Sequence, residues 1–145
     1  MAKEDPLALE RQVCFALAVA SRSVIALYRP VLEPMGLTHP QYLVMLALWE
    51  RSPRSLRDLS AALQLDPGTL SPLVKRLERA GLVTRDRDAQ DERMLCLTLT
   101  AKGRRLRSRA EKVPEQIVAK LGLPIGDLEH MHQVLTRVIA AANGA

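Results

Sequence analysis

Cys14 and Cys96 are the two cysteines of this 145-residue chain. Cys14 lies at one end of the apolar stretch QVCFALAVASRSVIALYRP, residues 12 to 30, and Tyr28 lies near the other end. Two cysteines are too few for a disulfide framework, and these two lack metal-ligand spacing. We therefore expect free thiols, so chemistry at Cys14 would be that of a reactive thiolate. The alternative is that Cys14 is a small buried hydrophobic residue.

The spacing of Cys14 and Tyr28 restricts how they could act together. Fourteen residues of helix correspond to about 40° in azimuth but roughly 21 Å along the axis, so the two side chains cannot touch within one chain. If two such helices met antiparallel across a dimer axis, the hydroxyl of Tyr28 of the partner subunit could donate a hydrogen bond to the Cys14 thiolate. The pair is compatible with a thiol site formed between subunits.

Other residues that could carry catalysis or bind metal are poorly arranged. His130 and His132 are two residues apart, so on a helix they point about 200° away from each other and are expected at the surface. The chain has no Gly-rich phosphate loop and no nucleophile elbow, which leaves a hydrolase built on Cys14 and His39 as the only enzymatic hypothesis. We expect neither an enzyme nor a bound metal or cofactor.

Basic residues are in excess and are clustered. The chain has 21 Lys and Arg against 16 Asp and Glu, a formal net charge of +5 and a pI near 9.7. Such an excess alone fits ordinary surface solubility as well as it fits an anionic partner. However, six basic residues and one acid lie between Lys102 and Lys112, and further Arg and Lys lie in residues 51–57 and 75–93. This clustering is typical of a nucleic-acid-binding protein.

The amino-terminal sequence, MAKEDPLALERQV, has acidic residues where a signal peptide would need basic ones. We judge that no later stretch approaches the roughly 20 apolar residues of a membrane span. We therefore expect a cytoplasmic protein without a membrane partner.

Apolar periodicity and capping residues predict helices over about 5–28, 38–50, 55–63 and 66–80. After Gly81 the apolar period changes from about four to two, which predicts a two-stranded hairpin between Leu82 and Leu99. A fifth helix follows, with Pro114 as a kink, and a sixth covers about 127–142. The predicted amino-terminal caps are Asp5, Thr38 with Gln41, Ser55 with Asp58, Asp66, and Thr100.

Two short capped helices joined by a tight turn and followed by a charged hairpin predict a winged helix-turn-helix. Short hydroxyls early in the second helix and cations later in it suit the base edges and phosphates of a major groove; they are Thr69, Ser71, Lys75, Arg76 and Arg79. An arginine at the hairpin tip, such as Arg85, Arg87 or Arg93, could enter a narrow minor groove. The alternative is an amphipathic helical hairpin with a solvated charged face.

Three segments resemble the MarR family of bacterial transcriptional regulators: LTHPQYLVMLALWE, LSAALQLDPGTLSPLVKRLERAGLVTR and DERMLCLTLTAKGRRL. The resemblance covers essentially the whole chain, and CFAL, YRPVLEPMGLT and LDPGTLSPLVKRLE resemble its branch that senses organic hydroperoxides, the OhrR-like branch. It implies a mainly α fold with a small β-hairpin wing, in which residues 1–145 form one domain. Residues of about 5–30 and 101–145 would form the dimerisation helices, and about 38–100 the winged helix-turn-helix.

The resemblance also implies a homodimer that binds a palindromic operator in double-stranded DNA. Residues that it places at the major groove are Asp66, Thr69, Ser71, Pro72, Lys75 and Arg76. It assigns the minor groove to the wing residue Arg93.

A reactive cysteine bonded by tyrosines of the partner subunit is a further implication of this resemblance. Cys14 and Tyr28 match two of the positions, and His39 stands where the second tyrosine would be. An organic hydroperoxide would oxidise Cys14 to a sulfenic acid, which a low-molecular-weight thiol would resolve, and the operator would be released. Phe15, Leu17 and Val19 would line an apolar pocket. Cys96, on the wing strand, is expected to be structural.

Two other functions are compatible with the sequence. A MarR-type repressor could release DNA on binding a phenolic or other aromatic ligand, with Cys14 merely packed. A protein-binding helical scaffold would be the alternative without DNA.

Overall fold

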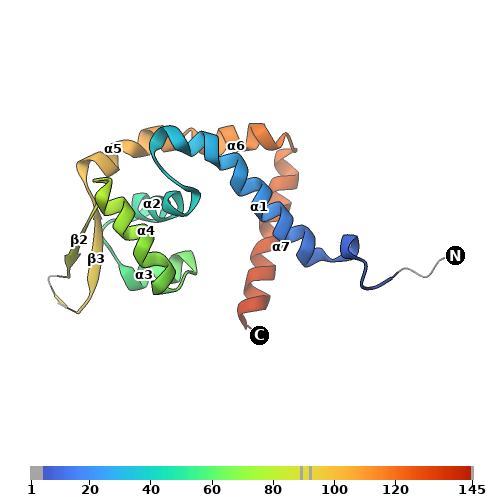
Figure 1. Ribbon diagram of the computed structural model, residues 1–145, viewed down its shortest axis with the longest axis horizontal. Helices are drawn as coiled ribbons and strands as arrows, with labels where there is room; N and C mark the ends of the chain where they lie inside the picture. The colour runs from blue at the N-terminus through green and yellow to red at the C-terminus, as the bar shows by residue number, and fades with distance from the viewer. Residues whose placement is uncertain (1–4, 89, 92, 145) are drawn as a thin grey trace. The chain divides into compact units, whose positions relative to one another are not determined.

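The computed structural model describes residues 5–88, 90–91 and 93–144. The chain divides into two compact units, Met1–Glu111 and Lys112–Ala145. The structure is mainly helical with a small sheet, as predicted (Figure 1). The first unit holds α1 (Val13–Leu32), α2 (His39–Glu50), α3 (Leu56–Leu63), α4 (Pro67–Arg79), α5 (Ala101–Ala110) and the sheet, and the second holds α6 (Val113–Leu121) and α7 (Ile125–Gly144).

The first α-helix begins later than predicted. The Asp5 carboxylate accepts a hydrogen bond from the backbone N–H of Leu7 at 2.9 Å, but this turn leads into a 3-10 helix, η1 (Leu9–Arg11). The Gln12 side-chain amide donates to two backbone carbonyls of the same turn and so stabilises it. The prediction that Asp5 caps the α-helix is therefore wrong, because local polar contacts close a separate turn ahead of Val13.

The same helix also ends later than predicted. It passes through Pro30, which lacks an N–H to donate, and continues to Leu32 before a second 3-10 helix, η2 (Glu33–Met35). Leu32 is fully buried, and its burial anchors the turn that Pro30 weakens. Gly36 then reverses the chain at a φ of 70°.

Caps predicted from the sequence form at α2, α3 and α4. Thr38 and Gln41 make the reciprocal contacts of a capping box. Ser55 accepts from the backbone N–H of Asp58 at 3.0 Å, but the Asp58 carboxylate binds arginines, so this second box is only half formed. The Asp66 carboxylate accepts from the N–H of Thr69 at 2.8 Å.

The sheet has three antiparallel strands in the order β1-β3-β2, one more than predicted. β2 (Val83–Arg87) and β3 (Leu95–Leu99) form the expected hairpin, and β1 (Arg54–Ser55) pairs with β3 on its other side. Two residues cannot display an alternating pattern, so β1 leaves no periodic signal in the sequence.

The α5 helix is joined closely to the first unit. Thr100 caps it, and the indole N–H of Trp49 on α2 donates to the Gly103 carbonyl at 2.9 Å. A Cβ on Gly103 would lie 2.2 Å from the carbonyl oxygen of Leu82, so only glycine permits this approach. The helix ends at Ala110, and Pro114 lies in the first turn of α6; the predicted kink is thus a break between two helices, where proline's missing N–H has no partner to lose.

The core of the first unit lies around α2, which packs against α3, α4 and α5 (Figure 1). The large side chains that are fully buried in this unit come from α1, α2, α3, α4 and the sheet; they are Leu32, Val44, Met45, Leu48, Leu59, Leu70, Val74, Leu77, Val83 and Leu97. Alternation on β3 buries Leu97 and Leu99 as predicted.

Long apolar helices in both units are left uncovered. Every residue of α1 from Val13 to Ser23 is exposed, and α7 has no buried residue among those described. Their exposed apolar residues include Phe15, Leu17, Val19, Met131, Val138 and Ile139.

By length and composition, Val13–Met35 could cross a membrane, and an 18-residue window within it has a mean hydropathy of 1.4. The expectation that no stretch reaches this length was therefore wrong, because the helix continues past Pro30. Arg22 and Arg29 lie within the span, and a bilayer would tolerate such charges only at considerable cost. A protein surface that covers the apolar face while its arginines stay hydrated suits this composition better.

Candidate nucleic-acid interface and thiol site

The α4 helix presents one apolar face and one polar face. Leu70, Leu73, Val74 and Leu77 are buried. The outward residues are those predicted to contact DNA: Thr69, Pro72, Lys75 and Arg76 are exposed, and Ser71 is half-buried. Asp66 precedes the helix as its N-cap, and its carboxylate is directed at the Thr69 N–H. The arrangement can present hydroxyls at the helix start and cations further along to a groove.

The wing tip is ordered by carboxylates that accept backbone hydrogen bonds. One Asp88 oxygen accepts from the N–H groups of Gln90 and Asp91 at 2.7 and 3.4 Å. The Asp91 carboxylate accepts from the Arg93 N–H at 3.0 Å, and the Arg93 side chain is exposed. Glu92, in the motif Asp-Glu-Arg, lies outside the described residues. The tip thus presents Arg93 from a hydrogen-bonded turn.

The wing is tied to α4 by an ion pair. Arg85 on β2 lies 3.2 Å from Glu78 on α4, and both side chains are partly exposed. Of the arginines considered for the minor groove, Arg85 is therefore engaged within the protein, whereas Arg93 projects from the tip. The pair favours a fixed angle between helix and wing.

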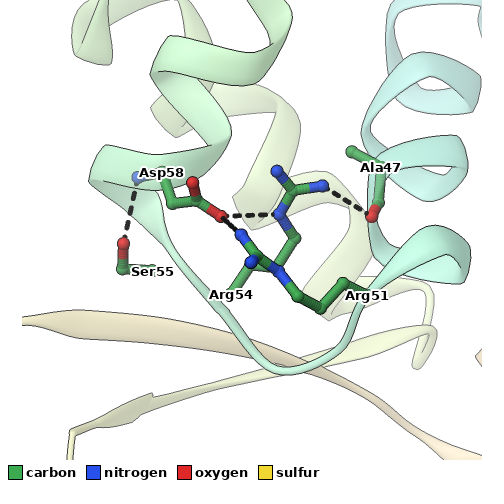
Figure 2. Close-up of polar contacts among 5 residues, drawn as sticks. All are labelled: Ala47, Arg51, Arg54, Ser55 and Asp58. Carbon is green, nitrogen blue, oxygen red and sulfur yellow. Dashed lines mark hydrogen bonds and ion pairs between the residues drawn. The ribbon is translucent and has the colours of Figure 1, made fainter.

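An arginine network joins α2 to α3 (Figure 2). Arg54 donates from Nε to Asp58 at 2.7 Å and from Nη1 to the carbonyl oxygen of Ala47 at 3.0 Å. Arg51 approaches the same carboxylate at 2.5 Å. Hydrogen bonds from Arg54 and Arg51 hold the pKa of Asp58 below its ordinary value. The side chain of Arg54 is 8% exposed and that of Arg51 is 65% exposed, so only Arg54 is an interior link.

The predicted thiol site is split by the length of α1. Cys14 is exposed in the first turn, and Tyr28 lies fourteen residues further along the same helix. The structure brings Tyr28 together with His39, the first residue of α2, at 4.8 Å between ring centroids. Tyr42 completes a cluster of three rings, 5.9 Å from Tyr28 and 6.5 Å from His39.

Burial fixes the protonation of this cluster. It lowers the pKa of His39 and raises the pKa of Tyr28 and of Tyr42, the last also through the nearby Tyr28. At neutral pH all three rings are uncharged, and each keeps a proton on nitrogen or oxygen that it can donate. The cluster can therefore supply hydrogen-bond donors without a positive charge.

Cys96 has different surroundings from Cys14. It is half-buried on β3, and its thiol lies 3.7 Å from an Asp88 oxygen, to which it donates. Burial and the neighbouring Asp88 carboxylate raise the pKa of the Cys96 thiol, which disfavours the nucleophilic thiolate. These contacts support a structural role at the wing.

A helix-turn-helix with an exposed polar face and a three-stranded wing defines a winged-helix DNA-binding protein. A family model for the transcriptional regulator SarA/Rot matches residues 26–109. The organic hydroperoxide resistance transcriptional regulator of Bacillus subtilis is 38% identical over 133 residues, which are 92% of this chain and 90% of that protein. The chain belongs to the MarR/SarA family of transcriptional regulators and is a DNA-binding regulator rather than an enzyme.

Solved structures agree with this assignment. Reduced AbfR bound to DNA is 35% identical with a TM-score of 0.76, and the match covers 92% of this chain and 94% of that one; AbfR comes from Staphylococcus epidermidis. AbfR has also been solved with a disulfide formed, at 38% identity, a TM-score of 0.65 and coverage of 90% and 92%. CouR from Rhodococcus jostii RHA1, solved with p-coumaroyl-CoA bound, is 29% identical with a TM-score of 0.77 and coverage of 91% and 94%.

Sequence reasoning missed two features of the site. The sequence patterns did not single out Tyr42, although its position three residues after His39 puts both residues on one face of α2. The bond from Arg54 to Ala47 has no sequence signal, because it joins an edge strand to a helix end across a turn.

Proposed function

We propose that this regulator is a repressor that senses organic hydroperoxides through oxidation of Cys14. The observation that carries the proposal is the placement of an exposed Cys14 at one end of an uncovered apolar helix and a three-ring donor cluster at the other. An antiparallel meeting of two α1 helices would bring these ends together. The similarity to the organic hydroperoxide resistance regulator supports this function.

Two copies of the chain would form the working unit. Exposed apolar residues on α1 and α7 are the kind of surface that a homodimer buries, and a palindromic operator requires two recognition helices. In the dimer, Tyr28 and His39 of the partner subunit would donate to the Cys14 sulfur. We expect this dimer in the cytoplasm.

The proposed chemistry needs one oxidant and one thiol. The Cys14 thiolate attacks the distal oxygen of a hydroperoxide; an S–O bond forms, the O–O bond breaks, and the peroxide leaves as an alcohol once protonated. The resulting sulfenic acid condenses with a low-molecular-weight thiol to give a mixed disulfide and water. The larger, polar sulfur no longer fits the aromatic cluster, so the interface repacks and the recognition helices move.

Operator binding is assigned to the exposed side of α4 and to the wing. Thr69, Ser71, Pro72, Lys75 and Arg76 would face the major groove, and Arg93 the minor groove. Asp66 would act through its cap on α4, since its carboxylate accepts from the Thr69 N–H and would be repelled by phosphates.

The test is operator binding by fluorescence anisotropy while cumene hydroperoxide is titrated in with a small thiol. Cys14→Ser should bind as tightly as the wild type and stay bound, because serine keeps the size but is neither ionised nor nucleophilic toward peroxide. Cys96→Ser, the matched control, should respond fully. Release of Cys14→Ser by peroxide would overturn the proposal, and an unresponsive Cys96→Ser would move the sensor to the other thiol.

A ligand-released repressor is the second candidate, favoured by the similarity to CouR with p-coumaroyl-CoA bound. In that case aromatic acids or their thioesters would release the operator from wild type and Cys14→Ser equally.

A further inference from the structure

The Arg54 side chain occupies a junction between three parts of the first unit. Its guanidinium bonds the Ala47 carbonyl in the last turn of α2 and the Asp58 carboxylate in the first turn of α3. Its backbone belongs to β1, where it pairs with Leu97 of the wing strand β3. One residue therefore connects the helix that starts at His39, the helix-turn-helix and the wing (Figure 2).

The α2 helix links this junction to the aromatic cluster. Its first turn carries His39 and Tyr42 beside Tyr28, and Ala47 lies eight residues after His39, about 12 Å along a rigid helix. A displacement of the cluster moves α2 as a body, and the guanidinium fork resists any change in the distance between Ala47 and Asp58. A nearly buried arginine that donates from two different nitrogens to two separate acceptors is well suited to hold such a geometry, because its guanidinium is planar and rigid.

We propose that Arg54 is the positioning residue that holds the helix-turn-helix, α3 and α4, at a fixed distance from α2. Through this link it transmits the state of the thiol site to α4 and the wing. The transmission part of this inference rests on the proposed peroxide-sensing function. The positioning part rests only on DNA binding, which the family membership establishes.

Removal of Arg54 should leave a folded protein with no orphaned polar group. The Ala47 carbonyl also accepts from the Arg51 backbone N–H at 3.2 Å, and Asp58 keeps its bond from the Arg51 guanidinium. Arg54→Met would therefore remove the link between α2 and α3 and keep much of the buried volume. Arg54→Lys is the sharper variant, since one ammonium can pair with Asp58 but lacks the fork that reaches both partners.

Arg51→Met is the matched control. It changes the net charge equally and removes a donor from the same carboxylate, but Arg51 is exposed and its side chain has no bond to α2 among the described residues. Operator affinity is measured by anisotropy across a salt series, with reduced and peroxide-treated protein, and folding is followed by thermal denaturation.

In the reduced state, both Arg54 variants should bind the operator about 5- to 10-fold more weakly than the wild type at an unchanged salt slope, because no phosphate contact is lost. The affinity ratio between reduced and oxidised protein should fall toward one, and Arg51→Met should keep affinity and ratio within about threefold. If the Arg54 variants melt earlier but keep affinity and ratio, Arg54 is merely structural and the proposal fails. A reduced salt slope would instead make Arg54 a DNA contact and would equally overturn it.

Failure of the sensing proposal gives a different pattern. In that event peroxide releases Cys14→Ser from the operator. The operator affinities of the Arg54 variants, measured on reduced protein, still test the positioning role. If those affinities match the wild type, the positioning part is wrong as well.

Discussion

Burial and hydrogen bonding set the charge of single residues in the aromatic cluster and at the wing. His39 is packed against Tyr28 and kept neutral, whereas Asp88 at the wing is kept ionised because it accepts hydrogen bonds from Gln90, Asp91 and Cys96. The first arrangement makes the aromatic cluster sensitive to acid. The second orders the turn from which Arg93 projects.

Acidification should destabilise the fold through His39. Burial lowers its folded pKa below the ordinary 6.5, so the unfolded chain binds the proton first and stability is lost as pH falls from about 6.5 through the folded pKa. We expect the melting temperature of the wild type to fall more between pH 7.5 and 5.5 than that of His39→Gln. His130→Gln, on the exposed α7 residue, should behave like the wild type. Equal pH dependence in wild type and His39→Gln would refute this role.

Arg93 and Asp88 should affect DNA binding in different ways. Arg93→Ala should weaken operator binding by about 1 to 3 kcal/mol and reduce the salt slope, because the positively charged side chain that contacts the DNA is removed. Asp88→Ala should weaken it without reducing the slope, because it only loosens the turn that presents Arg93. Anisotropy at several salt concentrations separates the two effects, and an unchanged affinity in Arg93→Ala would contradict the wing assignment.

At the scale of elements, N-cap residues fix where the helices start, and a glycine allows a close approach between one helix and a neighbouring backbone. Thr38, Ser55, Asp66 and Thr100 each accept a backbone hydrogen bond at a predicted helix start. Gly103 allows α5 to approach the backbone carbonyl of Leu82.

Gly103→Ala should therefore be costly. The new Cβ would lie 2.2 Å from the Leu82 carbonyl oxygen, so α5 must shift away from the sheet, and we expect a loss of about 1 to 3 kcal/mol in the free energy of unfolding. Gly126→Ala is the control, because nothing lies within 4 Å of its Cβ, and it should be neutral or slightly stabilising. Urea denaturation measures both; similar values for the two variants would count against the close approach.

Local signals predicted most of these elements, whereas contacts distant in sequence escaped prediction. The capping box at Thr38, the α4 N-cap and the alternation on β3 follow from neighbouring residues. The β1 strand depends on pairing with β3, and the passage of α1 through Pro30 depends on the burial of Leu32. In the site, the outward residues of α4 followed from the helical period, but the Arg54 junction depends on tertiary placement.

At the scale of the molecule, the main feature is the exposed apolar surface of α1 and α7. Every residue of α1 from Val13 to Ser23 is exposed, and no described residue of α7 is buried. We propose that a second copy of the chain buries this surface in a homodimer.

We expect sedimentation to show a homodimer at micromolar concentration, because burial of apolar surface on both helices favours association. Leu17→Asp should weaken it strongly, since a charge would enter the interface, and operator affinity should fall in parallel. Arg57→Asp, a charge reversal at an exposed α3 residue, should leave the dimer intact. A wild-type monomer at this concentration would be decisive evidence against the dimer.

The bare face of α1 has a consequence for gene dosage. If the operator binds only paired chains, and most chains are single at low abundance, the concentration of competent repressor rises with the square of chain concentration. Halving synthesis would then lower competent repressor about fourfold. Repression would respond steeply to expression level, and the strength of association through α1 would set the expression level at which repression is lost.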